Sequence, residues 1–123
     1  MKINFKRIDH IQICIPQNSE DEAKRFYVKV LGLLEIPKPE YLEVNGGFWL
    51  EIADIQLHIG VEKEIVTSKR HPAFEVDHLP AVKEYLISNG IRIKEDEPIP
   101  GFERFSFFDP FGNRIELLER ITK

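Results

Sequence analysis

Residues 8–15 read Ile-Asp-His-Ile-Gln-Ile-Cys-Ile, and this stretch decides the fold. Apolar and polar residues alternate along it, so Ile11, Ile13 and Ile15 share one face while His10, Gln12 and Cys14 share the other. A period of two is typical of a β-strand with one buried face. The acidic run Glu20–Glu22 follows, and acidic residues suit the positive N-terminus of a helix.

Working outward from this strand, the first half of the chain predicts one helix and three more strands. Asn18-Ser19 is the expected helix cap and Gly32 the expected stop. Asn45-Gly46-Gly47 predicts a hairpin between the first two of the later strands. The three strands are expected at Tyr41–Val44, Phe48–Ile52 and Ile55–Val61.

The second half repeats this order of elements. Its first strand is expected at His71–Val76, and its helix at Leu79–Ser88 with Asp77 as the N-cap. The Asp109–Asn113 segment is a dense turn signal. Three further strands are expected at Ile91–Lys94, Phe102–Phe108 and Arg114–Glu119.

Fixed offsets between matching residues indicate an internal duplication. Three pairs are 58 positions apart, namely Gly32 and Gly90, Tyr27 and Tyr85, and His58 and Glu116. A fourth pair, His10 and His71, is 61 positions apart. We therefore predict one α+β domain over residues 1–123, built from tandem βαβββ modules at 8–61 and 71–120. The two modules would form a curved, eight-stranded cup.

Four polar residues occupy matching places in the two modules: His10, His58, His71 and Glu116. A single histidine on a strand is more often structural than a ligand. Four such groups at duplicated positions favour a shared role, because burying each of them unpaired costs roughly 2–7 kcal/mol. Imidazole and carboxylate together bind first-row divalent ions, so we expect one metal ion, which could be Zn, Ni, Co, Mn or Fe.

Other polar and aromatic residues are expected to line a substrate pocket beside these ligands. Each candidate also has an interpretation without a functional role. The apolar side chains could simply pack in the wall or core of the protein, and the arginine could lie on the solvated surface. The candidates are Gln12, Cys14, Trp49, Arg104 and Phe107.

Composition excludes several other classes of protein. Apolar residues make up 42% of the chain and charged residues 31%, which argues against disorder. The net charge of −4 comes without a basic stripe, so we expect no nucleic-acid partner. No apolar run approaches the ~18–20 residues that span a bilayer, and no secretory signal is seen. With Cys14 as the single cysteine, a cytoplasmic protein is expected.

Five segments of the chain, taken in this order, form a recognisable pattern: IDHIQICIP (8–16), FYVKVLGL (26–33), GFWLEIADIQLHIG (47–60), RHPAFEVD (70–77) and DPFGNRIELLE (109–119). In these segments the chain resembles the vicinal oxygen chelate (VOC) superfamily, which includes glyoxalases, bleomycin-resistance proteins and extradiol dioxygenases. The resemblance implies a tandem βαβββ fold, a cup-shaped site, and usually a homodimer. It also implies that His10, His71 and Glu116 are metal ligands. The fourth ligand position, commonly glutamate in glyoxalase I, is His58 here.

Three functions are compatible with this resemblance. The first is a metal-dependent lyase or isomerase acting on a small oxygen-chelating substrate, with Glu116 as both ligand and base. The second is a small-molecule-binding or antibiotic-resistance protein without turnover. The third is an iron(II) dioxygenase, since two histidines and one carboxylate can hold iron.

Overall fold

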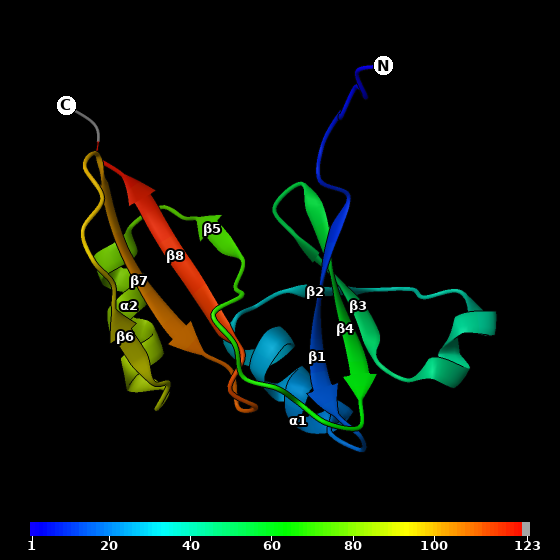
Figure 1. Ribbon diagram of the computed structural model, residues 1–123. Helices are drawn as coiled ribbons and strands as arrows, with labels where there is room; N and C mark the ends of the chain where they lie inside the picture. The colour runs from blue at the N-terminus through cyan, green and yellow to red at the C-terminus, as the bar shows by residue number, and fades with distance from the viewer. Residues whose placement is uncertain (122–123) are drawn as a thin grey trace. The chain divides into compact units, whose positions relative to one another are not determined.

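The computed structural model describes residues 1–121 and divides the chain into two compact units (Figure 1). The first unit is Met1–Ile65, and the second begins at Val66. Each unit holds one four-stranded mixed sheet and few helices. The expected α+β class and the tandem βαβββ order are therefore confirmed. Within residues 1–121, no helix is long and apolar enough to cross a membrane.

The sheet of the first unit has the strand order β1-β4-β3-β2, with β1 and β4 parallel and the other pairs antiparallel. The α-helix continues directly into a π-helical segment, where Leu31 N–H donates to the Phe26 carbonyl at 2.9 Å. The elements are β1 (His10–Pro16), α1 (Glu20–Lys24), the π-helix η1 (Arg25–Val30), β2 (Leu34–Ile36), the 3₁₀-helix η2 (Glu40–Asn45), β3 (Phe48–Ile52) and β4 (Ile55–Glu62).

One face of this sheet is apolar and the other carries the polar candidates. Ile13 and Ile15 of β1 and Leu57 of β4 are buried, as the alternation in residues 8–15 predicts. On the opposite face, the register places His58 beside both Gln12 of β1 and Trp49 of β3. The sequence pattern therefore positions these three side chains in one row across three strands.

The strand expected at Tyr41–Val44 is wrong. This segment lies in the 3₁₀-helix η2, and the second strand of the unit is instead Leu34–Ile36, which pairs with β3. Gly46 and Gly47 do adopt positive φ angles, but they join a helix to β3 rather than closing a hairpin. Glycine tolerates such angles in many kinds of turn, so the pair of glycines did not specify a hairpin.

The second unit repeats the arrangement, with the strand order β5-β8-β7-β6. Figure 1 shows α2 lying along the sheet beside β6 and β7. The register aligns Glu116 of β8 with Ala73 of β5 and Ser106 of β7. The elements are β5 (Ala73–Glu75), α2 (Leu79–Ser88), β6 (Ile93–Glu95), β7 (Phe102–Phe108) and β8 (Arg114–Arg120).

The predicted N-cap of α2, Asp77, is wrong, because the helix start is capped by a residue far away in the sequence. The N-cap residue is His78, in the left-handed conformation at φ 59°, and its own side chain makes no capping hydrogen bond. The carboxylate of Glu119 on β8 accepts the N–H groups of His78 and Leu79, each at 2.9 Å. These bonds hold the pKa of Glu119 below its usual value.

Candidate functional site

His71 and Glu116 form a close pair in the second unit. His71 lies two residues before β5, and Glu116 lies in the middle of β8. The His71 Nε2 atom is 3.1 Å from Glu116 Oε1. The Glu116 side chain is only 7% exposed and that of His71 is 27% exposed, so the carboxylate is buried while the imidazole is partly open to solvent.

A second contact fixes the tautomer of His71. Its Nδ1 atom is 2.7 Å from the backbone carbonyl oxygen of Lys69. A carbonyl oxygen can only accept, so Nδ1 carries the proton and Nε2 of a neutral ring presents a lone pair. That lone pair faces the Glu116 carboxylate. A proton on Nε2, which makes a hydrogen bond to Oε1, or a bound cation between the two atoms satisfies both groups.

Arg104 contributes a fixed positive charge beside the same carboxylate. Its Nη1 atom donates to Glu116 Oε1 at 3.1 Å, while its Nε atom donates to the Glu97 carbonyl at 2.8 Å. The Arg104 side chain is 16% exposed, so this is a partly buried ion pair. Both His71 and Arg104 contact Oε1, and neither of these contacts uses Oε2 of Glu116.

Beside this site lies a buried network that the sequence analysis missed. The Asp96 carboxylate is 2% exposed and accepts from Ser106 Oγ at 2.6 Å and from Arg114 Nη2 at 2.9 Å. Lys94 Nζ lies 3.1 Å from it. Burial raises the pKa of Asp96, but the bonds from Ser106 and Lys94 and the charge of Arg114 outweigh it and lower the pKa overall. Alternation along β7 places Ser106 on the face of Arg104, which was the available signal.

In the first unit, His58 lies between two other rings. Its ring is stacked on Trp49, with centroids 4.1 Å apart and planes 1° apart, and on His10, at 4.1 Å and 15°. The His58 Nε2 atom is 2.8 Å from Gln56 Oε1. Burial and then the nearby His10 ring lower the pKa of His58.

His10 has the same tautomer arrangement as His71. Its Nδ1 atom is 2.9 Å from the Asp9 carboxylate, so Nδ1 carries the proton and Nε2 presents a lone pair. A metal-binding histidine usually donates its other ring N–H to a carboxylate or a backbone carbonyl in this way. The bond from His10 also lowers the pKa of Asp9.

A cavity of about 230 Å³ lies beside this stack of rings, bordered by Gln12, Trp49, His58 and residues of η2. The Gln12 amide lies over Gly60, where an added Cβ would meet its Nε2 atom at 2.7 Å. Cys14 is half-buried, and burial, followed by Glu62, raises the pKa of its thiol. Gln12 and Trp49 thus border a cavity of this unit, and their role in substrate binding stays a prediction.

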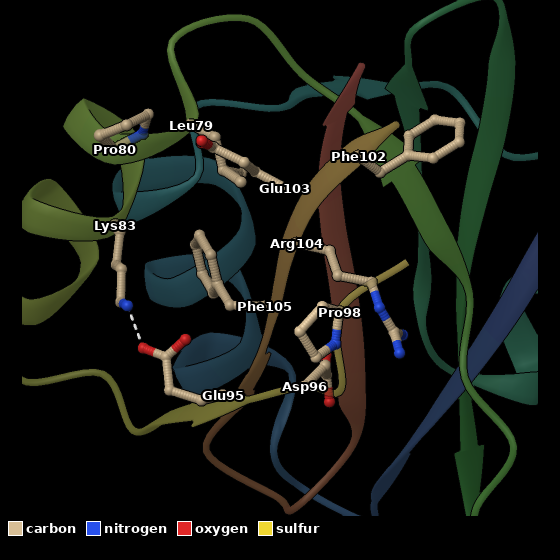
Figure 2. Close-up of a pocket in the computed structure, with 10 residues that line it drawn as sticks. All are labelled: Leu79, Pro80, Lys83, Glu95, Asp96, Pro98, Phe102, Glu103, Arg104 and Phe105. Atoms are coloured by element: carbon tan, nitrogen blue, oxygen red, sulfur yellow. Dashed lines mark hydrogen bonds and ion pairs between the residues drawn. The ribbon is translucent and has the colours of Figure 1, made fainter. Parts of the chain in front are cut away.

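A larger cavity, of about 400 Å³, lies in the second unit and is shown in Figure 2. Arg104 and Phe105 leave β7 on opposite sides, and Lys83 of α2 forms an ion pair with Glu95. Phe107, expected to line a pocket, is 1% exposed and shares the face of Phe105 rather than that of Arg104.

The four expected ligands are present as two pairs, His10 with His58 and His71 with Glu116. Across residues 1–121, no three His, Cys, Asp or Glu side chains are gathered as a metal site. Within the second unit, the donor chemistry of His71 and Glu116 nevertheless fits a divalent ion, because imidazole nitrogen and carboxylate oxygen are both ligands of first-row metals. In addition, two ligands about 2.1 Å from an ion are roughly 3 Å apart, like Nε2 and Oε1 of His71 and Glu116.

Comparisons with known proteins identify the family. The family model described as Glyoxalase/Bleomycin resistance protein/Dioxygenase superfamily matches residues 7–117. "Glyoxylase I 4" from Arabidopsis thaliana is 28% identical over 127 residues, which cover 94% of this chain and 71% of that protein.

Solved structures agree with this result. A protein from Bacillus anthracis placed in the glyoxalase family is 43% identical, with a TM-score of 0.91 over 98% of this chain and all of the other. The glyoxalase family protein from Enterococcus faecalis is 28% identical, with a TM-score of 0.75 over 94% of this chain and 98% of the other. The chain belongs to the glyoxalase/bleomycin resistance protein/dioxygenase (VOC) superfamily.

Proposed function

We propose that the chain is a metal-dependent enzyme of this superfamily, of the lyase or isomerase type, acting on a small substrate with two adjacent oxygen atoms. The observation that supports the proposal is the His71–Glu116 pair, in which Nε2 of a histidine oriented by Lys69 lies 3.1 Å from Oε1 of a buried carboxylate. His10, with Nδ1 bound to Asp9, is the third proposed ligand. His58 is a ligand by sequence prediction only.

When bound, the metal ion supplies Lewis-acid stabilisation of negative charge on the substrate oxygens. The residues of the chain have separate tasks. Lys69 and Asp9 hold the two histidine rings with Nε2 presented, through the Nδ1 contacts at 2.7 and 2.9 Å. Arg104 holds the Glu116 side chain in place through Oε1.

Glu116 is the proposed base. Its carboxylate takes a proton from the carbon next to a substrate carbonyl, and the C–H electron pair moves to the carbonyl oxygen. In a 2-hydroxy ketone or aldehyde, the hydroxyl proton then moves to the former carbonyl oxygen, the hydroxyl oxygen becomes the new carbonyl, and the abstracted proton returns to the former carbonyl carbon, which gives an isomer. Where glyoxalase I commonly has a second glutamate, this chain has His58. Glu116 is therefore the one carboxylate among the four expected site positions.

Metal binding is tested by titrating the purified protein with Co²⁺ and measuring the dissociation constant by calorimetry. We expect Glu116→Gln and His71→Ala each to weaken binding by at least tenfold. Glu103→Gln is the matched control, because Glu103 lies on β7, is exposed, and alternates to the face opposite Arg104. Equal Co²⁺ affinity in Glu116→Gln and Glu103→Gln would refute the proposed site.

Turnover is tested by incubating the Co²⁺-loaded protein in D₂O with small 2-hydroxy ketones and aldehydes. Proton abstraction predicts exchange of the C–H hydrogen for deuterium, which is seen as loss of the C–H signal in the ¹H NMR spectrum. Glu116→Gln should abolish this exchange, so the signal should remain. Tight substrate binding with no exchange would instead favour a binding protein without turnover. The cavity beside Trp49 is the observation that supports this second candidate.

The expected homodimer and the expected cytoplasmic location stay predictions. Sedimentation velocity of the purified protein tests whether it is a homodimer.

A further inference from the structure

The stack of three rings in the first unit restricts what His58 can do. Its ring is covered on one side by Trp49, at an interplanar angle of 1°, and on the other by His10, at 15°. Its Nε2 atom is occupied by Gln56 at 2.8 Å, and the residue is 7% exposed. Both faces of the ring and one of its nitrogens are therefore engaged.

This arrangement does not suit two ligands of one ion. The lone pair of an imidazole nitrogen lies in the plane of its ring, so two stacked, nearly parallel rings keep their lone pairs in two nearly parallel and separate planes. Two ligands of a single ion must instead direct theirs to one point, about 2.0–2.1 Å from each nitrogen. With ring centroids 4.1 Å apart, His10 and His58 cannot both do so while they are stacked.

Of the two histidines, His10 is the one prepared as a ligand. Its Nδ1 proton is donated to Asp9, which leaves Nε2 available. The His10 side chain is 46% exposed, so packing around it is too sparse to fix its ring. Two contacts restrain it, the carboxylate of Asp9 and the flat face of His58.

We infer that His58 is a positioning residue that holds the His10 ring by stacking and does not itself ligate the metal. Trp49 supports it from the other side. The inference rests on the proposed function in one respect, that His10 is a ligand. It departs from the fourth-ligand role that the family resemblance implies for this position. Changes to residues that orient a metal-binding histidine typically cost 10–100-fold in metal affinity.

The test compares a variant that keeps the stack with variants that remove it. His58→Phe retains a flat ring but has no ligand atom, and His58→Ala loses both. We expect His58→Phe to bind Co²⁺ within about threefold of the unmodified protein, with an unchanged Co²⁺ absorption spectrum, and His58→Ala to bind roughly 10–100-fold more weakly. Trp49→Ala should weaken binding in the same direction without touching any proposed ligand. Circular dichroism checks that each variant folds.

Loss of Co²⁺ affinity in His58→Phe as large as in His10→Phe, or a changed Co²⁺ spectrum in a folded His58→Phe, would overturn the inference. A second, metal-free measurement separates it from the proposed function. The His10 tautomer, read from ¹⁵N NMR of the apoprotein, should stay Nδ1-protonated in His58→Phe and become mixed in His58→Ala. If neither variant alters it, the positioning role is wrong. If the unmodified protein binds no Co²⁺, the proposed function fails, and the NMR result still decides the positioning role.

Discussion

Removing the Asp96 carboxylate should destabilise the protein strongly. Asp96→Ala deletes an acceptor that is 2% exposed, and Ser106 and Arg114 each lose their hydrogen bond to it while keeping the bond between themselves. Hydrogen bonds to charged groups contribute about 1.5–3 kcal/mol each, so the bonds at 2.6 and 2.9 Å together suggest a loss of about 3–5 kcal/mol. Lys94 adds little because its side chain is 51% exposed.

The assay is urea unfolding followed by circular dichroism, with Glu84→Ala on the exposed side of α2 as the control. The control should change the free energy of unfolding by no more than about 0.5 kcal/mol. The pKa of Asp96 is lowered in the folded state, so its stabilisation is present above the unfolded pKa and is lost as pH falls through the folded pKa. The difference between Asp96→Ala and the unmodified protein should therefore shrink below about pH 4. A loss under about 1 kcal/mol at pH 7 would refute this account of the network.

Two further perturbations test the packing and the helix cap. Leu50→Ala removes a fully buried side chain of β3 and should cost about 2–5 kcal/mol in the same urea assay, and a smaller change would mean that the first sheet repacks around the cavity. Glu119→Gln should lower the melting temperature at pH 7 by weakening the acceptor for His78 and Leu79. Because the pKa of Glu119 is lowered, this difference should disappear at acidic pH, and a difference that persists there would contradict the charge-assisted cap.

Most of the fold could be predicted because it depends on alternation and on repetition. The bounds expected for β3 and β7, Phe48–Ile52 and Phe102–Phe108, are those of the structure, since turn-forming residues flank both of these aromatic-rich strands. The strand at Leu34–Ile36 was missed because three residues are too few to show a period. Tyr41–Val44 was favoured instead because glycines follow it, although those glycines serve a different turn.

The candidate site was predictable in its residue types but not in its contacts. Strand register and alternation place His58 beside Trp49, yet nothing in the sequence specifies that their rings stack. Asp96 was missed because it follows β6, where no repeating pattern marks it as buried. Its partners come from β7 and β8, and such long-range polar networks depend on side-chain geometry that a single sequence does not encode locally.

The two modules of the duplication have one feature of the expected site in common and differ in another. The matching histidines, His10 and His71, both have Nδ1 bound to an oxygen, from Asp9 in one module and from Lys69 in the other. At the other matching position, Glu116 faces its histidine as a charged partner, whereas His58 lies flat against its own. Both modules thus have an oriented histidine, and the neighbouring position supplies a carboxylate in one module and a stacking ring in the other. The chemistry of proton transfer is therefore expected to depend on Glu116, and the His58 position to act through His10.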